Sequence, residues 1–417
     1  TSNWSGELVG FEILSNSEIG NILWNSSERV PSANDRNIRT LNAAGNGGVP
    51  FKWGSLTPAQ QAMLSVDGVS AAVAQDRMAF LRGSSAREQR NGGEFRDRVN
   101  GVIGDITNSD PVYVDNLESR LVSVPESDET SYAAFRSTLT SRPEMVYAVT
   151  NAGLLHGVCA LNCGSSVASG TELLAYVPGA VLPNMYELTS PDYTHRYYVD
   201  GPSSVSDAKV AGSWKTVLVG ALGAGGQAVY SLDVTNPVAF NDASVLWEFS
   251  PQKEAANLSV DISDTDLGYT IGKPQVARVK AGDKSVAIFA NGYNGRSGRA
   301  SLMVVDLETG NLIKRIRVNG AGSALAAPAL LDRDNDGYVD FVYSGDDAGN
   351  LWRFDLSGAD ISDWSLDLGG IPLLSAATGQ PITSAPTVYV SENDEVMVYV
   401  GTGRYLGVSD KSDVSVQ

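Results

Sequence analysis

The residues best suited to chemistry in this sequence are four aspartates within one nine-residue segment, 332–340, which reads DRDNDGYVD. Hard divalent cations such as Ca²⁺ take about six to eight oxygen ligands, and a tight loop with acids at positions 1, 3 and 5 supplies several of them at one point. The candidate metal ligands, at positions 1, 3, 5, 7 and 9, are Asp332, Asp334, Asp336, the carbonyl oxygen of Tyr338, and Asp340.

The segment resembles an EF-hand loop only in part. Gly337 falls at position 6, where such a loop turns sharply, but Tyr343 stands at position 12 in place of the bidentate Glu. Apolar, β-type residues flank the segment, so we expect an EF-hand-like loop between two strands. A solvated turn without metal is the alternative. Four carboxylates this close repel one another unless a cation is present, which favours Ca²⁺; Mg²⁺ demands stricter octahedral geometry.

The other candidate sites are weaker. Asp261, Asp264 and Asp266 form a looser acidic cluster without a turn glycine, for which we expect a solvated loop. The glycine-rich stretch 220–226 lacks the Lys-Ser/Thr of a phosphate-binding loop, so a hairpin turn is the better interpretation.

Catalytic patterns are scarce. Only two histidines occur, His156 and His195, which excludes three-histidine metal sites and His-Glu-x-x-His zinc sites. No Gly-x-Ser-x-Gly motif is present, and we expect His195 to be a packed residue rather than a base. The sequence therefore predicts a protein that is not an enzyme.

The two cysteines, Cys159 and Cys163, are four residues apart in a glycine-containing stretch. They could close a small disulfide loop, which would indicate an oxidising compartment. A zinc site is the alternative, but zinc normally needs four ligands and only His156 lies nearby. The spacing favours the disulfide.

Composition limits the partners. The 417 residues carry 48 Asp and Glu against 30 Lys and Arg, a formal charge of −18, and no basic run, so we expect no nucleic-acid partner. No apolar run is long enough to span a membrane. The chain starts at TSNWSG without a signal peptide, which we interpret as a mature or excised fragment.

Local patterns predict the elements that position these residues. Short alternating strands are expected over 7–13, 21–24 and 37–41. Helical insertions are expected near 57–82, where Thr57 and Gln60 form a capping signal and Gly68 a break, and near 128–139.

From Arg142 onward a unit of about 50 to 60 residues recurs: an X-Pro pair, a β-branched strand, a glycine-rich turn and a second strand. Its X-Pro pairs are Arg142-Pro143, Lys273-Pro274, Ala327-Pro328 and Ala385-Pro386. Repeats of this size and turn content are typical of propeller blades, with a stack of sandwiches as the alternative. We therefore predict an all-β fold, a single β-propeller domain over 1–417 with helical insertions.

A series of short sequence segments, in a shared order, makes the chain resemble the PilC/PilY family of type IV pilus-tip proteins. The segments that support the resemblance include Gly104-Asp-Ile-Thr-Asn-Ser-Asp-Pro111, Arg142-Pro-Glu-Met-Val-Tyr147, Tyr197-Tyr-Val-Asp-Gly201, Gly225-Gly-Gln-Ala-Val-Tyr-Ser-Leu-Asp233, Gly349-Asn-Leu-Trp-Arg-Phe-Asp355 and Gly401-Thr-Gly-Arg-Tyr405. The resemblance implies a modified propeller of about seven blades, and the family's calcium loop matches Asp332, Asp334, Asp336, Tyr338 and Asp340. Since the chain ends shortly after Tyr405, where relatives continue, the sequence leaves ring closure open.

The resemblance also implies a function. Such proteins link calcium occupancy to pilus extension and retraction, twitching motility and surface attachment. The implied partners are minor pilins, the pilus tip, and a host or abiotic surface. The implied location is the outer cell surface or pilus tip, after export through the periplasm. The family's variable N-terminal adhesive region is absent here, and so is any Arg-Gly-Asp motif.

Two other functions stay open at the level of sequence. Quinoprotein dehydrogenases are also propellers, but they typically use adjacent cysteines and calcium ligands scattered among blades. A calcium-dependent carbohydrate-binding propeller is the other possibility.

Overall fold

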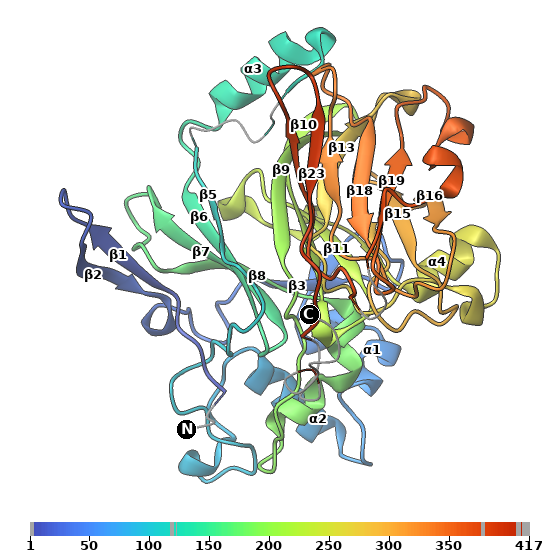
Figure 1. Ribbon diagram of the computed structural model, residues 1–417. Helices are drawn as coiled ribbons and strands as arrows, with labels where there is room; N and C mark the ends of the chain where they lie inside the picture. Colours follow the sequence, from blue (N-terminus) through green and yellow to red (C-terminus); the bar gives the residue numbers. More distant parts are fainter. Residues whose placement is uncertain (1–3, 117–120, 122, 377–379, 406–409, 411–417) are drawn as a thin grey trace.

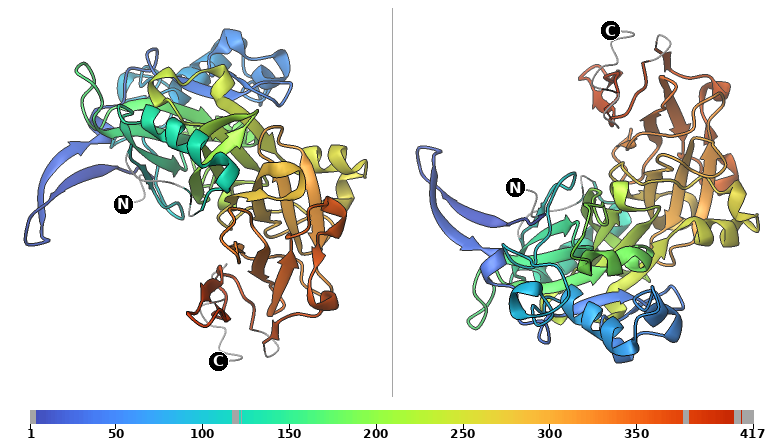
Figure 2. Two further views of the ribbon diagram at one scale, coloured as in Figure 1. Left: turned by 90° about the horizontal axis from the view of Figure 1, so that it is seen from above. Right: turned by 90° about the horizontal axis from the view of Figure 1, so that it is seen from below.

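The computed structural model describes residues 4–116, 121, 123–376, 380–405 and 410. Four sheets of four or more strands form an arc in Figures 1 and 2, and apart from the blue strands β3 and β4 of the first sheet their colours run from blue-green to red. Each sheet is built mainly from antiparallel neighbours in sequence, which is the blade pattern of a propeller. The predicted all-β propeller fold is confirmed.

The first sheet has the order β4-β3-β8-β7-β6-β5, with β3 parallel to β8. Its strands are β3 (Ile38–Leu41), β4 (Gly48–Pro50), β5 (Val112–Val114), β6 (Glu144–Thr150), β7 (Leu154–Leu161) and β8 (Glu172–Val177). The second sheet consists of β9 (Ser203–Val210), β10 (Ser213–Ala221), β11 (Val229–Asp233) and β12 (Val245–Phe249). N-terminal strands therefore complete the first blade.

The third and fourth sheets carry the candidate site between them. The third consists of β13 (Gln275–Val279), β14 (Lys284–Ala290), β15 (Ser301–Asp306) and β16 (Leu312–Arg317). The fourth consists of β17 (Ala329–Leu331), β18 (Phe341–Gly345), β19 (Asn350–Asp355), β20 (Ser365–Leu366) and β21 (Leu374–Ser375).

Two hairpins lie outside these sheets. The hairpin of β1 (Val9–Ile13) and β2 (Ile19–Asn25) projects from the body (Figure 2), while β22 (Thr387–Val390) and β23 (Val396–Tyr399) follow the fourth sheet. The described residues thus form four full sheets and one further hairpin after them, fewer than the roughly seven blades that the resemblance implies.

The recurrent X-Pro pairs mark where blades begin. Each of the four pairs directly precedes a strand that opens an antiparallel hairpin: β6 with β7, β13 with β14, β17 with β18, and β22 with β23. Proline cannot donate to a strand ladder, so it is favoured just ahead of a strand or at the edge of a sheet. The repeat prediction is confirmed.

The predicted helical insertions are confirmed. Thr57 and Gln60 form the expected capping box at the start of α1 (Pro58–Ala62), and Gly68 stands at φ +68° in the break before α2 (Ala71–Leu81). The second insertion is α3 (Glu129–Thr138), which lies at one end of the molecule beside β10 (Figure 1). A fourth helix, α4 (Pro251–Leu258), connects the second and third sheets and was not predicted.

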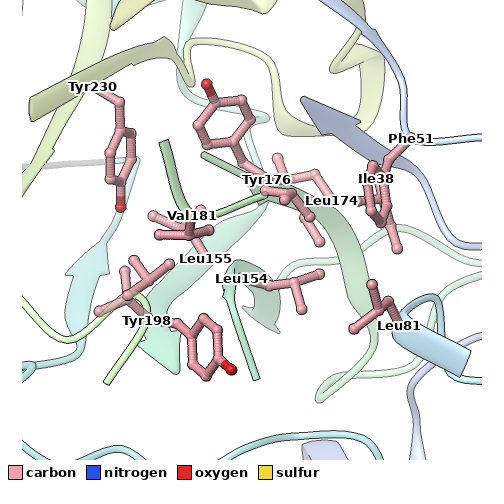
Figure 3. Close-up of a cluster of buried hydrophobic side chains, with 14 of the residues drawn as sticks. Ile38, Phe51, Leu81, Leu154, Leu155, Leu174, Tyr176, Val181, Tyr198 and Tyr230 are labelled. Carbon is pink, nitrogen blue, oxygen red and sulfur yellow. The ribbon is translucent and has the colours of Figure 1, made fainter. Parts of the chain in front are cut away.

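Apolar side chains fill the space between neighbouring sheets. The largest buried cluster joins the first two sheets to the helical insertion; it includes Leu81, Leu155, Tyr176 and Tyr230 (Figure 3). Two smaller clusters lie between the second and third sheets and between the third and fourth. Sheets pack face to face through such interdigitated side chains, so burial between blades fixes where each blade loop points. No helix in the described ranges is long and apolar enough to cross a membrane.

The cysteine prediction is also confirmed. Cys159, in β7, and Cys163 form a disulfide, which leaves no thiolate for zinc. His156, the other donor of the zinc alternative, is buried, and its Nδ1 lies 2.6 Å from Glu172 Oε2.

A buried ion pair joins the N-terminal segment to the first sheet. Arg36 contacts Glu172 through Nε and Nη2, at 2.7 and 2.8 Å, and both side chains are almost fully buried. Burial alone would raise the pKa of the Glu172 carboxyl, but the charge of Arg36 and the hydrogen bond from His156 lower it to about 2. The ionised form is therefore the form that the fold stabilises.

This pair predicts a specific loss of stability in acid. The folded pKa lies below the ordinary 4.5, so the carboxylate contributes stability above that pH which is lost as the pH falls towards about 2. Glu172→Gln should cost about 3 kcal/mol at neutral pH, because it leaves Arg36 buried and unpaired. The free energy of unfolding in urea, measured from pH 5 downward, should then fall less steeply in the variant. The exposed Glu18→Gln is the control; equal slopes in Glu172→Gln and wild type would contradict the assignment.

Candidate metal centre

The acidic segment forms the connection between β17 and β18 in the fourth sheet. The two strands pair from Ala329–Tyr343 to Leu331–Phe341, and the Asp340 N–H donates to the Leu331 carbonyl at 2.9 Å. The strand pair closes the base of the loop and fixes Asp332 and Asp340 at its two ends. The predicted position of the loop between two strands is confirmed.

Inside the loop, backbone amides hold the first aspartate. Asp332 Oδ1 accepts from the Asp336 N–H at 3.1 Å, and Asp332 Oδ2 accepts from the Gly337 N–H at 2.9 Å. The chain can turn this tightly because Asn335 and Gly337 adopt left-handed conformations, with φ +56° and +89°. This is the sharp turn that the glycine at position 6 predicts.

The structure gathers three of the four predicted acidic ligands. One carboxylate oxygen from each of Asp332, Asp334 and Asp340 lies within 4.8 Å of the others. Asp336 points to Lys280 instead, with its Oδ2 2.9 Å from Nζ, while its Oδ1 accepts the Tyr338 N–H at 3.0 Å.

The carboxyl groups of the loop have unequal electrostatic environments. The pKa of Asp340 is raised, first by burial and then by the charges of Asp334 and Asp336, although the Arg333 N–H opposes this shift. Burial also acts to raise the pKa of Asp336, but the hydrogen bond and charge of Lys280 and the hydrogen bonds from the Tyr338 N–H and Asp334 together outweigh it and lower the value. The loop therefore concentrates negative charge beyond what its own amides neutralise.

Tyr338 links the loop to the neighbouring blade. Its hydroxyl donates to Asp283 Oδ1 at 2.8 Å, and the guanidinium of Arg278 lies 5.5 Å from the centre of its ring. Burial and the contact with Asp283 raise the pKa of Tyr338 to about 12. These contacts fix the side chain, so the carbonyl of Tyr338 is the group left for a metal.

A distant segment braces the loop from outside. Ser123 Oγ donates to Asp332 Oδ2 at 2.6 Å, and the ring of Pro125 packs directly against Gly337. Three residues further on, Asp128 precedes α3 and pairs with Arg278, the residue that faces Tyr338. Sequence reasoning missed Ser123 because it lies 209 residues from its partner and no local pattern marks it.

The donor set fits a hard cation. All the side-chain and carbonyl donors that the loop offers are oxygens, three carboxylates already converge, and the amide contacts orient Asp332 as an EF-hand orients its first acid. Nitrogen and sulfur donors, which zinc prefers, are missing from the described part of this loop. Ca²⁺ suits such a flexible all-oxygen set better than Mg²⁺.

The second acidic cluster, Asp261, Asp264 and Asp266, differs from the loop. Asp266, expected in a solvated loop, is fully buried and pairs with Arg315 at 3.4 Å and Arg317 at 2.8 Å; for this residue the expectation was wrong. Two arginines of β16 supply the partners, which the local pattern around Asp266 did not show. Asp261 is exposed and caps a short 3-10 turn.

Two further expectations are confirmed. His195 packs against Trp4, with its Nε2 2.9 Å from Asp105 Oδ2. The glycine-rich stretch 220–226 leads from β10 to β11 as the turn of a hairpin.

Gly337 should be irreplaceable in this loop. A Cβ there would lie 2.5 Å from the Pro125 ring and would also strain a backbone at φ +89°. Gly337→Ala should therefore lower the free energy of unfolding by about 2–3 kcal/mol. Gly298→Ala is the matched control, since φ is +67° there with open space around it, and it should cost about 1 kcal/mol. Equal losses in the two variants, measured by urea unfolding, would contradict the close packing on Pro125.

Comparison with known proteins places this geometry in a family. A family model described as "PilY1 beta-propeller domain" matches residues 103–417. The chain is 34% identical over 467 residues to a protein of Xylella fastidiosa (strain Temecula1 / ATCC 700964) named "Type IV pilus biogenesis factor PilY1 homolog", covering 98% of this chain and 30% of that protein. It is 33% identical to "Type IV pilus biogenesis factor PilY1" of Pseudomonas aeruginosa (strain PAK), covering 99% and 37%.

A solved structure agrees with the sequence matches. The crystal structure of the Pseudomonas aeruginosa PilY1 C-terminal domain aligns with a TM-score of 0.57 and 32% identity, covering 70% of this chain and 60% of that one. The chain spans about a third of the length of the curated relatives that it matches. From its sequence, its sheets and these matches, the chain belongs to the PilY1 β-propeller family.

Proposed function

We propose that this chain is a calcium-binding, non-catalytic module of a type IV pilus assembly factor and tip adhesin. The observation that carries the proposal is the loop of four aspartates between β17 and β18, in a family whose named relatives are pilus biogenesis factors. Asp332, Asp334, Asp336, Asp340 and the Tyr338 carbonyl would hold the ion. The ion would neutralise their mutual repulsion and stiffen the loop.

The proposal includes a location and partners. The module acts at the pilus tip on the outer cell surface, after export through the periplasm, where it contacts minor pilins and a host or abiotic surface. The Cys159–Cys163 disulfide supports export through an oxidising compartment, since disulfides persist outside the reducing cytosol. The net charge of −18 gives no support to a nucleic-acid partner.

Calcium would regulate pilus extension and retraction, and through them twitching motility and attachment. A ligand shifts a conformational equilibrium only if its affinity differs between two states of the protein. The contacts of the loop with Ser123, with the segment before α3 and with the third blade give it several neighbours through which such a difference could act.

Removing a ligand should abolish calcium binding without unfolding the propeller. Asp332→Ala and Asp340→Ala should each weaken calcium binding by roughly a hundredfold or more, because each removes a charged ligand at one end of the loop. Isothermal titration calorimetry measures the affinity, and far-ultraviolet circular dichroism checks the fold. Asp261→Ala, an exposed acid elsewhere, is the control. Unchanged affinity in both loop variants would overturn the site assignment.

The cellular role has its own test. In the bacterium that makes the protein, deletion of its gene should remove surface pili and twitching. Restoring the full-length gene with Asp332→Ala should change twitching relative to the wild-type gene at equal protein level, because the regulated site is lost. Stab-agar twitching zones and pilus shearing measure both effects. Normal pili in the deletion strain would contradict the assembly role, and normal twitching with the variant would contradict regulation by calcium.

A further inference from the structure

An ammonium group stands among the candidate ligands. Lys280 Nζ lies 2.9 Å from Asp336 Oδ2, 3.8 Å from Asp334 Oδ2 and 3.9 Å from Asp340 Oδ1. Lys280 directly follows β13 and opens the turn to β14, so the group reaches the loop from the neighbouring blade. A single lysine thus contacts three of the four aspartates that we propose to bind calcium.

The other basic side chains around the loop have partners elsewhere. Arg333 pairs with Asp394 at 3.0 Å, and Arg278 pairs with Asp128 and Asp283. Within the described ranges, Lys280 is the one side-chain cation whose ion pairs are with these aspartates. It is therefore the main source of positive charge that offsets their repulsion.

The Lys280 ammonium and a divalent ion would draw on the same carboxylates, those of Asp334, Asp336 and Asp340. An ammonium is a compact charge on a flexible four-carbon stem, and the Lys280 side chain is about a third exposed, so it can swing into solvent. Asp336 must also turn from the ammonium towards the loop centre in order to act as a ligand. Binding of the ion would therefore favour release of the lysine.

We infer that Lys280 is a tethered counter-ion that competes with calcium for the loop. It keeps the metal-free loop folded, lowers the affinity for calcium, and ties the third blade to the fourth in the metal-free state alone. The exchange supplies the two states that regulation by calcium needs: a cross-blade ion pair without the metal and a released lysine with it. This inference rests on the proposed calcium site.

The test is calcium titration of charge variants at fixed pH and salt. Lys280→Gln should bind calcium roughly tenfold more tightly, because a charge within about 4 Å of three ligands no longer opposes the ion. Lys280→Arg keeps the charge and should stay within about threefold of wild type. Lys215→Gln is the matched control, because Lys215 pairs with Asp233 at 2.9 Å on another blade and is similarly exposed. The calcium affinity of this variant should stay within about twofold of wild type.

The metal-free protein supplies a second readout. In chelator, Lys280→Gln should melt at a lower temperature than Lys215→Gln, because three of the four aspartates have lost their counter-ion. Saturating calcium should remove most of that difference, since the ion takes over the neutralisation.

The outcomes separate the two proposals. No calcium binding by the wild-type protein would refute the calcium site and this inference with it. Calcium binding that is equal in wild type and Lys280→Gln, or weaker in the variant, would refute the role of Lys280 and leave the calcium site standing. Tighter binding in Lys215→Gln as well would also refute it, because the effect would then come from net charge alone.

Discussion

The constraint on which the site depends is the mutual repulsion of four aspartates held within one short connection. Like charges at this spacing favour either protonation or a compensating cation. Three kinds of contact offset this repulsion: backbone amides that donate to Asp332, the Ser123 hydroxyl, and the Lys280 ammonium. None of these contacts all four carboxylates as a divalent ion at their centre would, and this supports our proposal that the loop binds a cation.

The propeller holds the acidic loop in place despite this repulsion. Strands β17 and β18 fix the two ends of the loop, and the buried cluster between the third and fourth sheets holds the blades in register. Arg278 lies near the end of β13, and Lys280 and Asp283 lie in the turn that follows it, so the neighbouring blade supplies most of the charged surroundings. The site is therefore a property of two blades and of the segment before α3, and not of the nine residues alone.

Much of this could be predicted from local sequence. The acidic spacing with Gly337 gave the loop, the X-Pro pairs gave the start of each blade hairpin, and the Thr57 capping signal gave the first helix, because each depends on residues within a few positions. Contacts between blades could not be predicted. Ser123 and Lys280 resemble any other surface serine or lysine until the sheets bring them to the loop. Asp266 appeared solvated because its arginine partners lie about 50 residues away.

The most direct measurement is a crystal structure of this protein grown with calcium and examined by anomalous scattering. The account predicts one calcium peak inside the 332–340 loop, ringed by the carboxylates of Asp332, Asp334, Asp336 and Asp340 and the Tyr338 carbonyl, with the Lys280 ammonium turned away. A loop that contains only water at saturating calcium, with Lys280 still paired to Asp336, would contradict it.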